Sequence, residues 1–326
     1  MRSPNASENS APSASDGAHG PSPRSGQVHE PVFRHEALEY LGIRPGGRYI
    51  DATADGGGHT IDIANAIGPT GRVLAIEWDE TLFTNLEERI ARTWPRGNNA
   101  CVLQRTSYVQ IENLVRSLGF GPVDGVLFDL GLSSFHLERS KRGFSFQNHA
   151  EELDMRFSRD LRETGADILN ARTHDELAAI FRDYGQERFA DRIAAAVVAT
   201  RGRRPIRTVG DFLDAIAAGI PARFRRGKIH PATRAFQALR IAVNREFENI
   251  EAGLAAAFAA LAPRGRIAVI AFHSGEDGIV KRRFRDWAAR GEARLLTKKP
   301  IRPGADEVRA NPRARSAMLR AIEKIS

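Results

Sequence analysis

Residues 49–59 read Tyr49-Ile50-Asp51-Ala52-Thr53-Ala54-Asp55-Gly56-Gly57-Gly58-His59. A short apolar run that ends near an acid and opens into three glycines is typical of a strand, a tight loop and the start of a helix. Glycines at that place let the backbone approach a ligand closely at a helix N-terminus. This stretch therefore predicts an α/β fold with a ligand site at the end of its first strand.

Outward from this stretch, Glu77 ends the next predicted strand, residues 72–77. Glu77 follows Gly58 by 19 positions, the spacing at which an acid accepts hydrogen bonds from ribose hydroxyls. The pair indicates a nucleoside-containing cofactor; the alternative is an ordinary glycine-rich turn beside a surface glutamate. A dinucleotide or ATP site is disfavoured, because Ile61 stands where the G-x-G-x-x-G fingerprint has its third glycine and no lysine precedes Lys141.

Further apolar runs predict strands over residues 100–104, 124–129 and 266–272. Apolar strands that alternate with helices indicate a parallel sheet covered on both faces. From residue 140 to about 230 the pattern is helical and contains no convincing strand. Helices are predicted over 81–91, 186–200, 209–220, 232–260 and 276–289, and strand-like pieces over 294–297 and 317–325.

The simplest organisation is one α/β domain that is interrupted by a helical insert. Residues 1–28 are rich in Ser, Pro, Ala and Gly, so we expect a disordered tail. Residues 29–139 would form the first part of the sheet domain, residues 140–230 the inserted helical substrate-recognition domain, and residues 231–326 the second part of the sheet domain.

Composition places the chain among soluble globular proteins. Its 326 residues are 42% hydrophobic and 27% charged, which are ordinary values for that class. No run approaches the roughly 18 apolar residues of a membrane span. Cys101 is the only cysteine, which fits a reducing compartment, and the N-terminus lacks the apolar segment of a secretory signal. We therefore expect a cytoplasmic protein that does not enter a membrane.

The charge is segregated along the chain. Residues 1–138 carry a net charge of −6, residues 139–234 a net +6, and residues 264–326 a net +9. This pattern predicts a polyanionic partner for the middle and C-terminal thirds. Two basic clusters of the insert are candidates for contact with RNA phosphates; the alternative is that they only form a solvated surface. The candidate residues are Arg203, Arg204, Arg225, Arg226 and Lys228.

Asp129 ends the predicted strand 124–129. Ligands of open parallel sheets bind beyond the carboxyl ends of the strands, so Asp129 is expected near Gly58 and Glu77. Its carboxylate could accept a hydrogen bond from an amine or hold part of the cofactor; the alternative is a cap of the following turn.

A metal site is disfavoured, because His59, His230 and His273 stand in three separate loops without ligand spacing.

Several long motifs in one order carry a resemblance that spans residue 29 to about residue 322. They are Asp124 to Asp154 (DGVLFDLGLSSFHLERSKRGFSFQNHAEELD) running into Met155-Arg156, then Tyr184-Gly185 with Glu187-Arg188-Phe189-Ala190, His230-Pro231-Ala232-Thr233-Arg234 with Phe236-Gln237, Phe272-His273-Ser274 with Glu276-Asp277, and Asn311-Pro312-Arg313-Ala314-Arg315-Ser316. In these blocks the chain resembles the MraW family, S-adenosylmethionine-dependent methyltransferases that modify N4 of a cytosine in the decoding region of small-subunit (16S) ribosomal RNA.

The resemblance implies a class I (Rossmann-like) S-adenosylmethionine-dependent methyltransferase core with an inserted helical domain. Small-subunit rRNA or the 30S subunit would be the partner, S-adenosylmethionine the cofactor, and a homodimer stays an open alternative. Carried over by motif, the residues that would bind the cofactor are Gly57, Gly58, His59, Glu77, Tyr108, Asp129 and His136. The family usually reads Phe-Gly-x-Gly-Gly-His where this chain has Ala54-Asp55-Gly56-Gly57-Gly58-His59, so Asp55 replaces the leading glycine.

The resemblance also suggests a mechanism. Cytosine N4 is a weak nucleophile, and an acceptor on its amine can localise the lone pair and take the proton. We place Asp129 in this catalytic role, helped by Ser133 or Ser134, on a base that is flipped into the site.

Two alternatives stay open: a catalytically weakened relative that acts as a ribosome-assembly RNA-binding factor, which Asp55 favours, and another methyltransferase acting on DNA or a small molecule. Three aromatic rings could stack on RNA bases; the alternative is that they are buried under the insert. They are Phe144, Phe146 and Phe157.

Overall fold

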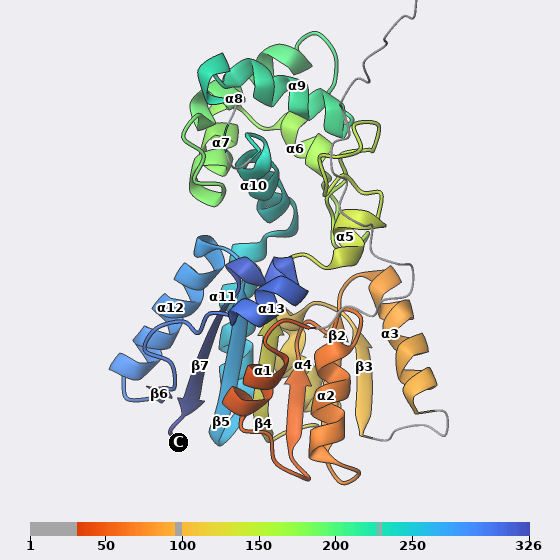
Figure 1. The fold of residues 1–326 in the computed structure, drawn as a ribbon, viewed down its shortest axis with the longest axis vertical. Helices are drawn as coiled ribbons and strands as arrows, with labels where there is room; N and C mark the ends of the chain where they lie inside the picture. The colour runs from red at the N-terminus through yellow and green to blue at the C-terminus, as the bar shows by residue number, and fades with distance from the viewer. Residues whose placement is uncertain (1–30, 95–99, 226, 228–229) are drawn as a thin grey trace, which may run out of the picture.

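A seven-stranded sheet forms one half of the molecule (Figure 1). The computed structural model describes residues 31–94, 100–225, 227 and 230–326. The predicted tail 1–28 and two of the predicted RNA contacts, Arg226 and Lys228, therefore lie outside the described residues. The strand order is β3 (Cys101–Arg105), β2 (Arg72–Glu77), β1 (Arg48–Asp51), β4 (Val123–Asp129), β5 (Leu261–Ala271), β7 (Met318–Lys324) and β6 (Ala293–Leu295).

Strands β1 to β5 are parallel, as expected, but the sheet as a whole is mixed. Strand β7 pairs with β5 in the antiparallel sense, and β6 pairs with β7 in the same way. The route of the chain explains this pairing. Helix α12 (Ser274–Ala289) returns the chain to the amino-terminal ends of the parallel strands, at the bottom of Figure 1, and β6 runs up from there. Strand β7 is entered from the carboxyl-terminal ends of the parallel strands, so it runs in the opposite direction. The predicted parallel sheet thus holds for the five strands of the alternating pattern, and the two strand-like pieces predicted after them form its antiparallel side.

Helices cover both faces of the sheet, and strand β2 shows why its sequence is continuously apolar. Leu74 and Ile76 belong to one buried cluster, and Val73 to a second buried cluster on the opposite face. The first cluster includes residues of α4 (Ile111–Ser117), α11 (Glu246–Ala260) and α12. The second includes residues of α1 (Arg34–Leu41) and α2 (Gly58–Ile67), and α3 (Glu80–Thr93) packs on the same side through Leu86 against Ala75. Alternate residues of a strand point to opposite faces, so a doubly covered strand needs apolar residues at every position.

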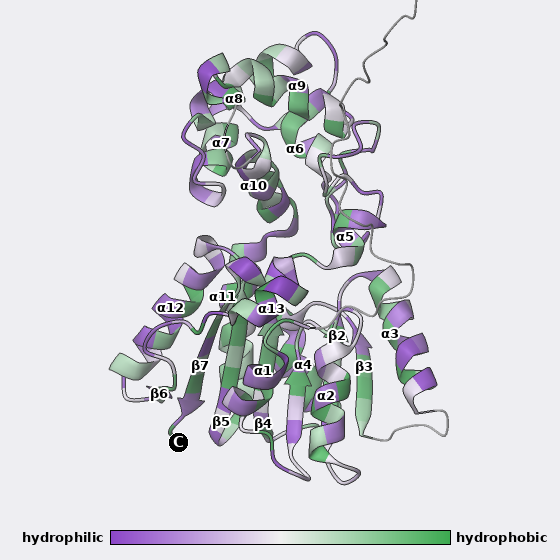
Figure 2. Cartoon of the chain, viewed as in Figure 1, coloured by the Kyte–Doolittle hydropathy of each residue, from purple (hydrophilic) through white to green (hydrophobic). Residues whose placement is uncertain are grey.

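Figure 2 shows this pattern as mainly hydrophobic central strands beside helices such as α3 that present hydrophilic residues outward. Within the described residues, no helix combines the length and the apolar character that crossing a membrane would require.

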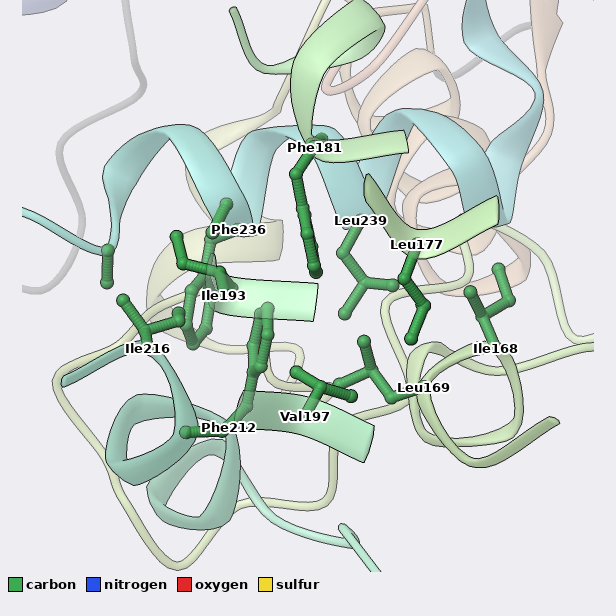
Figure 3. Close-up of a cluster of buried hydrophobic side chains, with 14 of the residues drawn as sticks. Ile168, Leu169, Leu177, Phe181, Ile193, Val197, Phe212, Ile216, Phe236 and Leu239 are labelled. Atoms are coloured by element: carbon green, nitrogen blue, oxygen red, sulfur yellow. The ribbon is translucent and has the colours of Figure 1, made fainter. Parts of the chain in front are cut away.

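The helical half of the molecule has a core of its own (Figure 3). Phe181, Phe212 and Leu239 lie at its centre and are fully buried. The helices that build it are α6 (Gly165–Ala171), α7 (His174–Ala179), α8 (Ala190–Arg201), α9 (Val209–Gly219) and α10 (Thr233–Asn244). The boundary placed between residues 230 and 231 stays a prediction, but α10 lies beyond it and packs in the helical core.

The single helix expected over residues 232–260 was wrong. The structure has two helices, α10 and α11, which meet at Arg245. Arg245 has φ 50° and ψ 43°, a left-handed conformation that ends an α-helix. The break lets α10 pack in the helical core while α11 packs against the sheet, so this junction connects the two halves of the molecule.

Candidate functional site

The carboxyl ends of β1, β2 and β4 border two connected hollows between the sheet and the helical half. We name them the inner hollow, which reaches Glu77 and Tyr108, and the outer hollow, which reaches His59 and Arg313. The residues that line both of them are Thr53, Asp55, Leu82, Asp129, Gly131, Leu132, Ser133, Phe272 and Glu276. The three predicted strand ends thus meet at one place.

The glycine loop turns sharply between β1 and α2. Gly57 has φ 79°, which favours glycine, and a side chain there would lie 2.7 Å from Leu86 of α3. Gly57 is therefore needed for packing, whereas Gly58 and His59 line the outer hollow. Asp51 lies beneath the loop and accepts a hydrogen bond from the Thr60 hydroxyl at 2.6 Å. Burial raises the pKa of Asp51 to about 6.

Glu77 is buried at the end of β2, and its carboxylate faces the inner hollow. The backbone N–H groups of Asp55 and Asp79 each donate a hydrogen bond to it, both at 2.8 Å. Burial, together with the negative charge of Asp55, raises the pKa of Glu77 to about 8. Each carboxylate oxygen keeps a further lone pair for a ligand hydroxyl.

Tyr108 forms the opposite wall of the inner hollow. Its ring packs edge-on against Phe128 with the centroids 5.5 Å apart. On the other side the ring lies so close to Gly253 of α11 that an added Cβ there would come within 2.4 Å of it. Gly253 therefore allows the backbone of α11 to hold Tyr108 against the sheet, and a flat aromatic surface borders the hollow.

Asp129 and His59 face each other where the two hollows join. The His59 Nε2 atom lies 3.7 Å from an Asp129 oxygen, and neither ring nitrogen of the buried His59 has a hydrogen-bond partner among the described residues. Burial lowers the pKa of His59 to about 4, so its ring is neutral near pH 7. Burial, and then the charges of Asp55, Asp51 and Glu276, raise the pKa of Asp129 well above its ordinary value.

Ser133 and Ser134 follow the Asp129-Leu130-Gly131 turn and are tied to different parts of the chain. The Ser133 hydroxyl donates a hydrogen bond to Asp55 at 2.8 Å and accepts one from the Phe135 N–H at 3.1 Å. Arg313 donates a hydrogen bond to the Ser134 hydroxyl. All three predicted catalytic residues, Asp129, Ser133 and Ser134, line the outer hollow.

His136 lines the inner hollow, but its hydrogen bond points away from it into a buried polar network. The His136 Nε2 atom lies 3.1 Å from Asp79, which also accepts a hydrogen bond from Arg142. Asp79 caps α3 by accepting from the Thr81 and Leu82 N–H groups. The network thus joins the sheet half to the segment that leads into the helical half.

Sequence reasoning missed a set of buried polar residues at the junction of α10 and α11. Arg240 and Glu246 form a bidentate ion pair at 2.7 and 2.9 Å, with Arg240 on the outer hollow and Glu246 on the inner one. Asn244 accepts a hydrogen bond from the Phe157 N–H and donates to the Met155 carbonyl, both at 2.7 Å. The sequence signal that could have revealed this set is the presence of polar residues on the apolar side of a predicted helix.

The described basic candidates lie on the surface of the helical half, away from the lining of the hollows. Arg203, Arg204 and Arg225 are exposed. Arg204 pairs with Asp211 at 2.9 Å, and Arg225 donates to the Ile220 carbonyl at 2.9 Å.

The three phenylalanines considered for base stacking pack with other aromatic rings. Phe144 is buried and stacks on Phe157 at 5.6 Å, and Phe146 stacks on His230 at 4.4 Å. These contacts favour the packing alternative for all three rings, although Phe157 also borders the inner hollow.

Over residues 31–94, 100–225, 227 and 230–326, no group of three or more His, Cys, Asp and Glu side chains is arranged to hold a metal ion. His273 instead caps helix α12, where it accepts from the Glu276 N–H at 3.4 Å.

Comparison with known proteins finds extensive similarity. The model of the MraW methylase family matches residues 26–325. A ribosomal RNA small subunit methyltransferase H from Thermomicrobium roseum is 48% identical over 314 residues, covering 92% of this chain and 94% of that protein. A protein of the same name from Symbiobacterium thermophilum is 43% identical over 312 residues, covering 91% and 96%. One from Desulfotalea psychrophila is 42% identical over 299 residues, covering 92% and 99%.

Proposed function

The chain belongs to the MraW methylase family, and from this premise we propose that it transfers a methyl group from S-adenosylmethionine to N4 of a cytosine in the decoding region of small-subunit rRNA. The observation that carries the proposal is the convergence of Glu77, Asp129 and the glycine loop on two connected hollows. The relatives are named as small-subunit rRNA methyltransferases, which supports rRNA as the substrate.

The residues of the hollows fit S-adenosylmethionine. Glu77 has free lone pairs for ribose hydroxyls, and Tyr108 offers an aromatic face to the adenine. Asp55 and Asp129 would complement the ammonium and sulfonium charges, and the unpartnered ring nitrogens of His59 could meet the methionine end. In this proposal Gly57 and Gly58 shape the loop, and His136 orients the wall of the inner hollow. The bound cofactor supplies an electrophilic methyl group on a sulfonium.

For the chemical step, Asp129 would accept a hydrogen bond from the cytosine amine and then its proton. A carboxylate with a raised pKa is a better proton acceptor than an ordinary one. Ser133 and Ser134 would hold the base in line with the donor methyl group, because methyl transfer depends mainly on the position of the reactants. Arg203, Arg204 and Arg225, together with Arg226 and Lys228, would contact RNA phosphates.

One observation bears on the alternative of a weakened relative that serves as an assembly factor. Asp55 has φ 45°, so it keeps the left-handed backbone that a glycine would adopt. Its carboxylate is held by Ser133 at 2.8 Å. The replacement thus leaves the loop in a form that can still receive a cofactor, and measurable uptake of S-adenosylmethionine in calorimetry would argue against a binding-only role.

The function is tested by nucleoside mass spectrometry of 16S rRNA from a strain that lacks this gene. We expect N4-methylcytidine to be absent from the deletion strain and to return when the protein is supplied again. Methylation at another base or atom after add-back would refute the assignment, as would a modification level that the deletion leaves unchanged. Methylation of isolated 30S subunits and of free rRNA in parallel identifies the form of the substrate.

Glu77→Gln tests the cofactor site. We expect the variant to bind S-adenosylmethionine about 10-fold more weakly in calorimetry at about pH 9, above the pKa of about 8 at which Glu77 ionises. A hydrogen bond from ribose to a charged group contributes roughly 1.5–3 kcal/mol. The matched control is Glu87→Gln on the exposed face of α3, which should bind like the natural chain. Equal affinity in both variants would remove Glu77 from the site.

The same variant has a predicted pH dependence without cofactor. The pKa of Glu77 is raised from 4.5 to about 8, so between these pH values the unfolded chain releases a proton that the folded chain retains. The natural protein should therefore lose stability, relative to Glu77→Gln, as the pH rises from about 4.5 to 8. Thermal melts at several pH values measure this difference.

A further inference from the structure

The surface of the helical half carries an exposed aromatic ring among cations. Phe224, in the short 3₁₀ turn Ala222–Phe224, is 38% exposed. In the described part of the chain, Ile325 at 53% is the other exposed large hydrophobic side chain. Single exposed apolar residues are common on proteins, so exposure alone does not identify a ligand.

The surroundings of Phe224 are unusual. Its ring packs on Phe189 with centroids 5.2 Å apart, which fixes one part of the ring against helix α8. The guanidinium carbons of Arg188 and Arg223 lie 5.1 and 4.9 Å from the ring centroid. We name Arg188, Phe189, Arg223 and Phe224 the aromatic platform.

Neither arginine of the platform has an ion pair with a carboxylate among residues that the structure describes, whereas Arg204, nearby in sequence, is paired with Asp211. Both Arg188 and Arg223 are exposed, and the segment 201–234 carries a net charge of +7. The platform therefore offers a partly exposed aromatic ring beneath two guanidinium groups, and neither cation is paired with a carboxylate among the described residues. An anionic partner that also has flat rings matches both features.

We propose that the aromatic platform binds an unpaired base of the substrate RNA by stacking on Phe224, while Arg188 and Arg223 contact the adjoining phosphates. This inference rests on the proposed function, since it takes RNA to be the substrate. Unpaired bases stack on exposed aromatic side chains without needing a specific sequence, and the flanking arginines supply the charge. The platform would thus favour single-stranded RNA segments over duplex RNA, because a duplex presents no unpaired base.

The test uses two RNA probes of equal length, a hairpin with 2-aminopurine in its single-stranded loop and a fully paired duplex. Phe224→Leu should weaken binding of the hairpin about 10-fold, as expected for the loss of one base–aromatic stack, and should leave duplex binding nearly unchanged. It should also abolish the quenching of 2-aminopurine on binding. Phe224→Trp should retain both properties, and Ile325→Ser is the matched control that should change neither.

Equal losses on hairpin and duplex, or no loss on either, would overturn the platform. An unchanged affinity for both RNAs with weaker binding to assembled 30S subunits would also overturn it, since the surface would then meet a protein. The proposed function is tested separately by methylation of small-subunit rRNA. If small-subunit rRNA is methylated but hairpin binding does not depend on Phe224, only the platform is refuted. If hairpin binding depends on Phe224 but small-subunit rRNA is not methylated, only the proposed function is refuted.

Discussion

Asp129→Asn is expected to slow methyl transfer about a thousandfold, within the range of roughly 10²–10⁴ that a positioned proton acceptor contributes. In the proposed mechanism Asp129 takes the proton of the cytosine amine, and asparagine has the same shape but cannot do so. Cofactor affinity should fall much less than turnover, because Glu77 and the glycine loop are unchanged. The measurement is single-turnover transfer of labelled methyl groups to 30S subunits, with calorimetry of the same variant.

The pH dependence of this step gives a second readout. In the proposed mechanism transfer requires the ionised form of Asp129, so the rate of the natural protein should rise with pH through a pKa that lies above the ordinary value of 3.8. Asp129→Asn should lose this rise. His59, 3.7 Å away, is neutral over that range and should not contribute. Full turnover with normal cofactor binding in Asp129→Asn would remove Asp129 from the mechanism.

The sheet edge at the hollows was predictable because local patterns and one topological rule are sufficient for it. The apolar runs before Asp51, Glu77 and Asp129 each correspond to a strand. Parallel strands bring their carboxyl ends to the same edge, so residues up to 78 positions apart, such as Asp55 and Ser133, come into contact. The loss of strand patterns after residue 139 then predicted the helical insert within the sheet domain, and the motif resemblance implied the same organisation.

The junction between the two halves was not predictable in the same way. The apolar pattern continues from α10 into α11, and no glycine or proline marks the break at Arg245. The break instead depends on a tertiary interaction, because Arg240 and Glu246 are buried and pair across it. In the sequence, Arg240 on the apolar side of the predicted helix indicates a buried polar site, but it does not show that the helix breaks at Arg245.

His136 shows a second limit of sequence reasoning. A motif match places it at the cofactor, and it does border the inner hollow. Its hydrogen-bond partner, Asp79, is 57 positions earlier in the chain, and the third member, Arg142, is 63 positions from Asp79. No periodicity relates such distant residues, so only the folded structure reveals that His136 also belongs to a buried network.

That network is the basis of the largest expected effect on stability. Asp79 is fully buried, and Arg142 and His136 are nearly so. Burial alone would raise the pKa of Asp79, but its hydrogen bond with His136 and the charge of Arg142 outweigh this and lower the pKa below 3.8. The ionised carboxylate is therefore stabilised in the fold, and this contribution should be lost only as the pH falls below about 4.

Asp79→Ala should lower the free energy of unfolding by about 3–5 kcal/mol, because it leaves Arg142 buried without its partner and removes the cap of α3. Urea unfolding at pH 7 measures this loss. Glu112→Ala, which breaks the exposed pair with Arg116, is the matched control and should cost less than about 1 kcal/mol. Amide exchange should also accelerate around residues 139–158, since Arg142 donates to the carbonyls of Arg156 and Phe157. If both variants lose the same small amount, then the connection between the halves depends on the α10–α11 junction rather than on Asp79.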